Sequence, residues 1–269
     1  MSQPSVSNQV ALLEREIGAR LLAREPGGLK LTAEGEVLLE HADAIAERFD
    51  LATEQLAAAA QGARARLRIG AFPTALAAFV PDAIARVREE YPHAKVTVDE
   101  GTDDLAARTR SGELHLAVGF QDAAETRDTP SGVERRDLFR EHFRVAFAPD
   151  HPMAGRPHIR LADLRDEDWT AAVPDGLIVR ACRHAGFEPN LVSLTHDQLA
   201  IRALVRRGLA VTLVPELLAE PFRDLALLHI DGPGPARDVY ALLPPGGRHP
   251  LVAPALDALE TTAAGLDER

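Results

Sequence analysis

The stretch that decides the fold class is residues 67–99, LRIGAFPTALAAFVPDAIARVREEYPHAKVTVD. Leu67–Phe72 predicts a strand, Ala75–Glu90 carries apolar residues at helical spacing, and Lys95–Asp99 alternates in the manner of a second strand. Strand, helix and strand in this order typically join parallel strands through a helix that packs on the sheet. The stretch therefore predicts an α/β fold with a mostly parallel sheet.

The same alternation continues to the end of the chain. Further strands are expected at Leu114–Phe120, Glu134–Leu138 and His142–Pro149, and Leu251–Ala264 predicts a closing helix. About 200 residues of this pattern fit two small α/β subdomains better than one. We expect subdomain I at about 66–142 and 238–264 and subdomain II at about 143–237, within one domain over 66–264.

A long helix is expected before this domain, from Thr32 as N-cap to about Ala60, with the linker and dimerisation helix bounded at 36–65. Its apolar positions alternate four and three residues apart, which is the seam of a coiled coil. At ~1.5 Å per residue the helix is about 40 Å long. The alternative is one amphipathic helix that packs on its own domain. The predicted dimerisation residues are Leu38, Ala42, Ile45, Phe49, Ala52 and Leu56.

Residues 2–17 predict another helix, with an apolar stripe at Val6, Val10, Leu13 and Ile17 and with Gly18 at its end. The turn Pro26-Gly27-Gly28 then separates two short arms, which predicts a small hairpin that carries Arg24 and Lys30.

The charge is distributed unevenly along the chain. All 269 residues together carry a formal net charge of −11, which taken alone argues against a nucleic-acid partner. In residues 1–35, however, four basic residues balance four acidic ones, so the whole excess belongs to residues 36–269. The N-terminal segment therefore has to be judged separately.

Motifs for catalysis are missing from the sequence. It has no Gly-x-Ser-x-Gly elbow and no Gly-x-x-x-x-Gly-Lys phosphate loop. Cys182 and His184 stand two residues apart on a predicted helix and face different sides, so they are not expected to share a metal ion. Cys182 is expected to be a small core residue. We expect no enzyme activity, no catalytic residue, no cofactor and no metal site.

The sequence contains no run of 18 or more apolar residues, so no membrane span is predicted. A cytoplasmic location is expected.

Three segments together resemble the LysR-type transcriptional regulators. Ser2–Gly18 with Arg20-Leu21-Leu22 resembles their recognition helix and the following turn, and Leu31–Gly35 resembles the junction between wing and linker helix. Gly208–Pro215, GLAVTLVP, resembles a strand of their effector-binding domain. The resemblance implies a winged helix-turn-helix, a linker helix that pairs with a second subunit, and two periplasmic-binding-protein-like (type 2) subdomains that close around a small effector.

The family's DNA-binding domain normally begins roughly 30 residues earlier, so residues 1–35 are expected to be a partial winged helix-turn-helix that lacks two helices and binds operator DNA poorly. The resemblance implies promoter DNA and a homodimer or homotetramer as partners. Polar residues at the start of the recognition helix can reach base edges, and wing cations can contact phosphates. The predicted DNA-binding residues are Gln3, Pro4, Ser5, Ser7, Asn8, Arg24 and Lys30.

The effector is expected where strands end and helices begin, because ligands of open α/β sheets bind there. Thr74 and Thr195 each precede a predicted helix, and a hydroxyl with helix amides can hold a carboxylate. A small organic acid is therefore expected, although no arginine is assigned to this pocket. The predicted effector-binding residues are Pro73, Thr74, Phe120, Gln121, Thr195, His196, Val214 and Pro215.

Three other functions stay open at this point. A solute-binding protein shares the two-lobed fold but has no coiled-coil helix and wing. An enzyme on the same scaffold needs a nucleophile or an acid–base pair in the cleft. A module that binds an effector and dimerises, but does not bind DNA, follows if the N-terminal helices are absent.

Overall fold

The computed structural model divides into two units, Met1–Ala57 and Ala58–Arg269, and each unit is a body of its own. It describes residues 3–25, 28–39, 41, 42, 45, 49, 53, 66–246 and 249–266, and the side chains of residues 3–8, 24, 25 and 28 lie outside this description. Within the described residues, no helix has both the length and the apolar character that crossing a membrane requires.

The N-terminal unit begins with helix α1, Gln3–Ile17, which ends as predicted at Gly18 with φ +78°. Strands β1, Leu22–Glu25, and β2, Gly28–Leu31, pair antiparallel and form the predicted hairpin. Glu14 fastens the helix to the hairpin, since one of its carboxylate oxygens accepts the amides of Leu21 and Leu22 at 2.8 and 3.2 Å. These two bonds lower the pKa of Glu14.

A second helix follows the hairpin, and every described residue between 33 and 53 is helical. Thr32 is the predicted N-cap, since its hydroxyl accepts the amide of Gly35 at 3.0 Å. Gly35 lies so close to the hairpin that a Cβ there would collide with the carbonyl oxygen of Leu21. The turn between hairpin and helix thus depends on this glycine.

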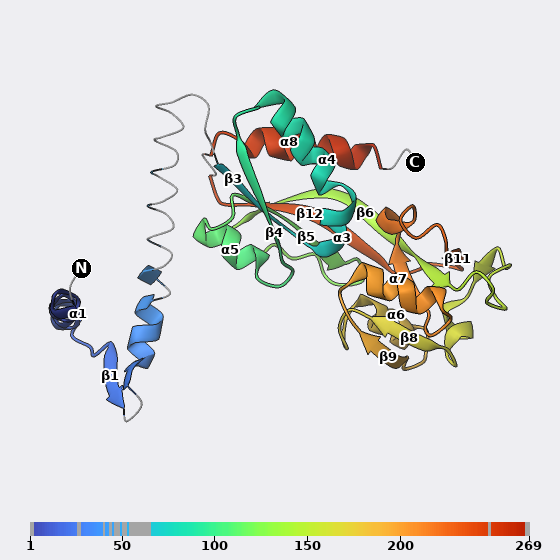
Figure 1. Ribbon diagram of the computed structural model, residues 1–269, viewed down its shortest axis with the longest axis horizontal. Helices are drawn as coiled ribbons and strands as arrows, with labels where there is room; N and C mark the ends of the chain where they lie inside the picture. The colour runs from blue at the N-terminus through green and yellow to red at the C-terminus, as the bar shows by residue number, and fades with distance from the viewer. Residues whose placement is uncertain are drawn as a thin grey trace. The chain divides into compact units, whose positions relative to one another are not determined.

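The C-terminal unit is built on one eight-stranded sheet in the order β4-β3-β5-β12-β6-β11-β7, with β10 paired to β6 (Figure 1). The pairs of β3 with β4 and β5 are parallel, whereas β12 and β10 pair antiparallel with their neighbours. The prediction of a mostly parallel sheet is therefore wrong, because β12 returns from the far end of the chain and enters the sheet in the opposite direction. The strands are β3 Arg66–Ala71, β4 Lys95–Glu100, β5 Leu116–Asp122, β6 Glu134–Phe147, β7 His158–Ile159, β10 Thr212–Pro215, β11 Ala226–Ile230 and β12 Ala236–Leu243.

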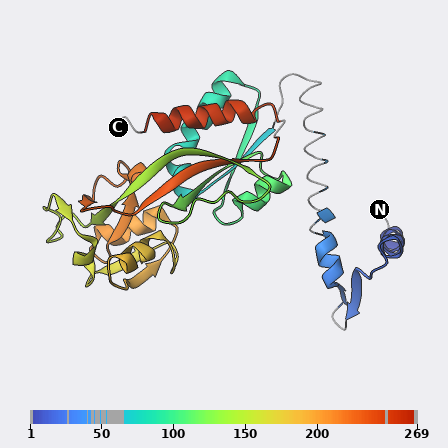
Figure 2. The ribbon, with the colours of Figure 1, turned by 180° about the vertical axis from the view of Figure 1, so that it is seen from behind.

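Strand β6 corrects a second prediction, because it is one strand of 14 residues where two strands were expected. Its residues up to His142 pair with β12, and its residues from Phe143 pair with β10 and β11. In Figure 2, β6 and β12 run side by side along the length of the unit. β6 thereby carries the sheet from one half of the unit into the other.

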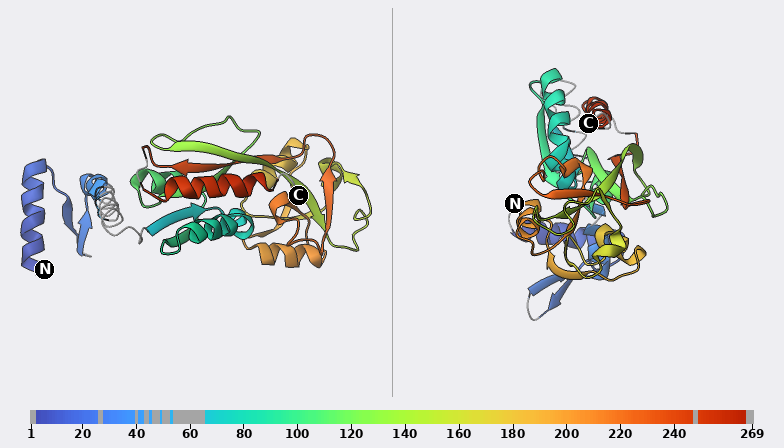
Figure 3. Two further views of the ribbon diagram at one scale, coloured as in Figure 1. Left: turned by 90° about the horizontal axis from the view of Figure 1, so that it is seen from above. Right: turned by 90° about the vertical axis from the view of Figure 1, so that its right-hand side faces the viewer.

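The first half, called the first lobe, has its core between β3, β5 and β12 and the helices α3, α4 and α8. Helices α4 and α8 lie next to each other over the sheet (Figure 3), and Phe79, Leu67 and Leu116 are fully buried. The helices of this lobe are α3 Pro73–Ala78, α4 Val80–Glu90, α5 Leu105–Ser111 and α8 Val252–Ala264.

The second half, called the second lobe, packs around Trp169, which is fully buried, as is Cys182. Cys182 is thus the small core residue that the sequence predicts. The second lobe contains η1 Leu161–Leu164, β8 Asp168–Ala171, α6 Leu177–His184, β9 Asn190–Leu194, α7 Gln198–Arg206 and η2 Glu216–Leu218, together with β7, β10 and β11.

Candidate functional site

A cavity of about 640 Å³ opens between the two lobes of the C-terminal unit. The first lobe contributes Phe72, Thr74 and Phe120, and the second contributes the segment that enters α6 and the end of β10. Six of the eight predicted effector-binding residues line it: Pro73, Thr74, Phe120, His196, Val214 and Pro215. The structure thus brings these residues together, and their contact with an effector stays a prediction.

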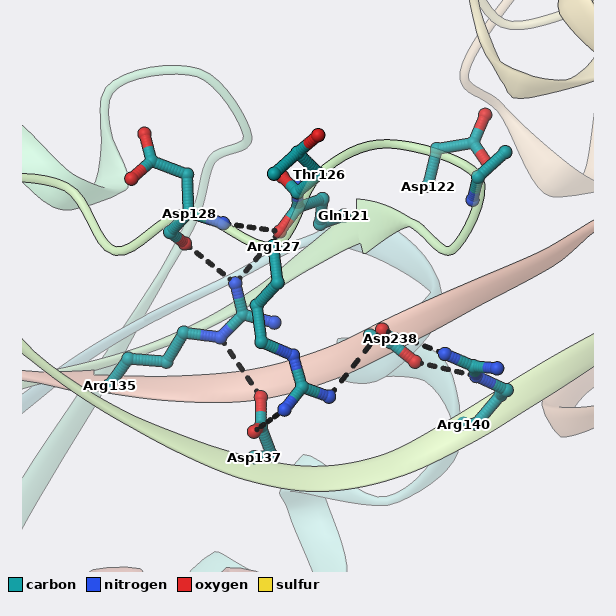
Figure 4. Close-up of polar contacts among 10 residues, drawn as sticks. Gln121, Asp122, Thr126, Arg127, Asp128, Arg135, Asp137, Arg140 and Asp238 are labelled. Carbon is teal, nitrogen blue, oxygen red and sulfur yellow. Dashed lines mark hydrogen bonds and ion pairs between the residues drawn. The ribbon is translucent and has the colours of Figure 1, made fainter.

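Gln121 and Thr195 do not line the cavity. Neighbouring residues on a strand point to opposite faces of the sheet, so Gln121 faces away when Phe120 faces the cavity. Instead, Gln121 holds the loop after β5, because it donates to the carbonyl of Thr126 and accepts from Arg135 at 2.8 Å (Figure 4). Thr195 accepts the amide of Asp197 at 3.1 Å in the turn before α7.

The floor of the cavity carries an arginine that the sequence does not reveal. Arg237 is 5% exposed and donates to Glu141 through Nε at 2.6 Å and to Thr74 through Nη2 at 2.7 Å. Glu141 and Arg237 stand opposite each other on β6 and β12, where β6 passes from the first lobe to the second. No arginine could be assigned to this pocket from the sequence, because this pairing depends on the register of two strands almost a hundred residues apart.

Aromatic rings surround this guanidinium, with the centroids of Phe72, Phe120 and Phe143 at 4.6, 4.9 and 5.4 Å from its central carbon. Burial lowers the pKa of Arg237 and raises that of Glu141, and the attraction between the two opposes both shifts. Contact at 2.6 Å with two guanidinium nitrogens keeps the pair ionised. The floor thus consists of an ion pair that has no net charge and is surrounded by apolar rings.

A second arginine, Arg180, lies on the wall that α6 provides. Its Nε and Nη2 donate to Asp122 at 3.1 and 3.0 Å, and Nη2 also lies 3.3 Å from Glu125. The sequence predicts a helix at Arg180, and Val179 beside it is buried in the structure. Nothing in the sequence indicates that the Arg180 side chain reaches β5. A donor-rich cavity with apolar rings suits a small molecule that carries oxygen acceptors.

Two features of the described residues bear on metal binding and on nucleophilic chemistry. No group of three or more His, Cys, Asp or Glu side chains is placed there to hold a metal ion. Burial raises the pKa of Cys182 to about 12, which makes this thiol a poor nucleophile at neutral pH.

The N-terminal unit presents the predicted interface residues only in part. The side chains of Gln3, Pro4, Ser5, Ser7, Asn8 and Arg24 lie outside the described residues, as do Ala52 and Leu56 altogether. Lys30 is exposed on β2, as predicted for the hairpin. On the long helix Leu38 is half-buried and Ala42 exposed, whereas Ile45 and Phe49 are 69% and 72% exposed. Two large apolar side chains one turn apart thus face away from the unit's own core.

Comparison with known proteins matches both units to models of the same protein family. Residues 60–264 match the model of the LysR substrate binding domain, and residues 1–36 match that of the bacterial regulatory helix-turn-helix protein, lysR family. The transcriptional dual regulator GltC of Bacillus subtilis (strain 168) is 32% identical over 219 residues, which cover 79% of this chain and 71% of GltC. A probable hydrogen peroxide-inducible genes activator of Mycobacterium avium is 32% identical over 89% of this chain and 78% of its own length.

Solved structures agree with these sequence matches. The crystal structure of CbnR, a LysR family transcriptional regulator, aligns with a TM-score of 0.68 and 26% identity over 98% of this chain and 90% of that one. Full-length CbnR complexed with its target DNA aligns with a TM-score of 0.68 and 25% identity over 97% and 91% of the two chains.

Proposed function

The chain belongs to the LysR family of transcriptional regulators, and we propose that it controls transcription from a promoter in response to a small molecule held between the lobes of its C-terminal unit. The observation that carries the second half of this proposal is the cavity of about 640 Å³, whose walls come from both lobes. A ligand that touches both lobes can favour one lobe arrangement over another, which is what an effector has to do.

We propose that different segments of the two units have different roles. Residues 1–35 contact DNA, 36–65 pair with a second copy in a homodimer or homotetramer, and 66–264 bind the effector. In support, α1 precedes a two-stranded hairpin with an exposed Lys30, and Ile45 and Phe49 leave an apolar surface on the long helix. Gln3, Pro4, Ser5, Ser7 and Asn8 at the start of α1 then face the bases, and Arg24 and Lys30 the phosphates.

The proposed effector is a small organic acid with an apolar body. Arg180 on the α6 wall and Arg237 on the floor supply donors, Thr74 supplies a hydroxyl, and the phenyl rings of Phe72, Phe120 and Phe143 supply apolar surface. Both arginines already have carboxylate partners, so the site favours one or two oxygen acceptors over a densely charged anion.

Sensing through a cysteine is the other candidate, because several relatives are named hydrogen peroxide-inducible genes activators. Oxidation by peroxide requires an accessible thiolate. Cys182 is fully buried with a raised pKa, and the sequence contains no other cysteine. These observations favour a non-covalent effector.

We propose further that the chain has no catalytic activity of its own and acts in the cytoplasm, where the chromosome lies. Both statements rest on its relatives, which are named transcriptional regulators. The coiled-coil pattern and the hairpin of the N-terminal unit argue against a solute-binding protein.

Selection of DNA from a random duplex pool by the purified chain tests the DNA-binding half. Residues 1–35 are expected to bind DNA weakly, but repeated rounds should still enrich one motif with two related half-sites, and Gln3→Ala should relax the preference at one position of each. If no motif is enriched, the chain acts only as an effector-binding and dimerisation module.

A further inference from the structure

The two lobes of the C-terminal unit are joined by an ion pair as well as by the strands that run between them. Asp122 is the last residue of β5 in the first lobe, and Figure 4 shows it where that strand passes into the following loop. Arg180 belongs to α6, whose buried residue Cys182 packs in the core of the second lobe. Its contact with Asp122 at 3.0 Å therefore connects one lobe to the other beside the cavity.

The pair is well placed to resist separation of the lobes. The side chain of Asp122 is only 10% exposed, and its other oxygen accepts the amide of Ala124 at 3.0 Å. The carboxylate is thus fixed by its own turn, and Arg180 is fixed by a bond from Nη1 to the carbonyl of Asp175 at 2.8 Å. When the lobes part, a nearly buried carboxylate loses its cation, which costs more than breaking an exposed pair.

The ion pair of Glu141 with Arg237 differs in this respect. Glu141 lies on β6 and Arg237 on β12. These two strands pair directly with each other, so the contact persists when the lobes rotate about them. Arg180 and Asp122 lie on elements that do not pair with each other, and their contact has to break. Of the two arginines that line the cavity, Arg180 is therefore the one whose ion pair breaks when the lobes separate.

We propose that the Arg180–Asp122 pair is a tie that holds the lobes together in the absence of ligand and thereby limits access to the cavity. Glu125, 51% exposed and 3.3 Å from Arg180, is its weaker second anchor. The inference deepens the proposed function, since it assigns the control of ligand entry to one contact at the edge of the effector site.

Hydrogen exchange of the ligand-free full chain, followed by mass spectrometry, tests the tie in Arg180→Gln and Asp122→Asn. The informative amides are those of residues 102–104 in the first lobe and 196–198 in the second, which include cavity-lining residues of both lobes. We expect their exchange to rise about threefold to tenfold in both variants, because the open form becomes more populated. Arg180→Lys keeps the charge and should stay closer to the wild-type rate.

The matched control is Arg183→Gln. Arg183 lies on the same helix but pairs with Asp175 and Glu188, both within the second lobe, at 2.8 Å. Unchanged exchange at residues 102–104 and 196–198 in Arg180→Gln and Asp122→Asn, or an equal rise in Arg183→Gln, overturns the proposal.

If the variants do not fold, the wild-type chain still decides the question. Raising the salt concentration from about 0.05 M to about 1 M weakens partly exposed ion pairs and should speed exchange at the same amides, whereas an unchanged rate overturns the tie. The readout involves neither DNA nor effector, so failure of the proposed function leaves it unaffected.

Discussion

The two units of the chain differ in how well their large apolar side chains are packed into a core. In the C-terminal unit Trp169, Phe79 and Phe147 are fully buried, and each lobe has its own core. In the described part of the N-terminal unit, Ile17, Ile45 and Phe49 are 46%, 69% and 72% exposed. The C-terminal unit can therefore be stable by itself, whereas the N-terminal unit has apolar surface left for other partners.

A substitution in the buried core should have the largest effect. Trp169→Ala removes the largest buried side chain of the second lobe, and we expect the free energy of unfolding to fall by about 3–5 kcal/mol. Urea denaturation followed by circular dichroism measures the fall. A loss below about 1 kcal/mol would show that the second lobe does not depend on this core.

Acid should weaken the C-terminal unit next. His115 and His249 are buried and stacked with ring centroids 4.2 Å apart. Burial, with His249 and Arg68 nearby, lowers the pKa of His115 to about 3, and burial lowers that of His249 to about 4. Both folded-state values lie below the unfolded value near 6.5, so the unfolded chain binds protons more tightly. Stability is then complete above pH 6.5 and falls as the pH drops toward 4, by about 2 kcal/mol per histidine at pH 5.

The control for this pH dependence is His115→Gln, which removes one of the two titrating rings. Urea midpoints at pH 7.5 and pH 5 should differ by about half as much in the variant as in the wild-type chain. An equal difference in both proteins would assign the acid sensitivity to other groups.

The exposed apolar surface gives a smaller effect, on association and not on folding. Phe49→Ala should weaken the self-association constant by about tenfold to a hundredfold, since about 1.5–3 kcal/mol of burial is lost from the proposed helix pair. Sedimentation equilibrium measures the constant. Leu199→Ala is the matched control, because Leu199 is 74% exposed but belongs to α7 of the C-terminal unit. Similar weakening by both substitutions would remove the long helix from its proposed role.

The smallest expected effect concerns the hairpin. Lys30→Ala should weaken binding to all DNA sequences alike and reduce the slope of log K against log salt by about one for each subunit, because one phosphate contact is lost. Fluorescence anisotropy at several salt concentrations gives the slope. An unaltered slope would show that Lys30 does not contact phosphate.

Local patterns in the sequence predicted much of the fold. Gly18 and Thr32 bound their helices as expected, and the hairpin between them follows from its turn residues. What failed were features that depend on distant pairing. The length of β6 and the direction of β12 depend on which strands meet, and no local signal encodes that.

The candidate site shows the same limit. Pro73, Thr74 and Val214 could be placed at the cavity because ends of strands gather at one edge of an α/β sheet. Arg237 was missed because its partner Glu141 is opposite it only in the folded register. Gln121 was expected beside Phe120 at the cavity, but it does not line it, because neighbouring residues of a strand point to opposite faces of the sheet.

Effector response is the most direct test of the central claim that a small molecule between the lobes controls this regulator. A reporter behind the DNA motif recovered by selection is assayed against a panel of small organic acids, with the wild-type chain and with Val173→Trp. Val173 is 41% exposed at the cavity, so a tryptophan there blocks the space without entering a core. We predict that at least one acid changes the wild-type signal, and that Val173→Trp binds the same DNA but no longer responds. A full response in Val173→Trp would contradict the claim.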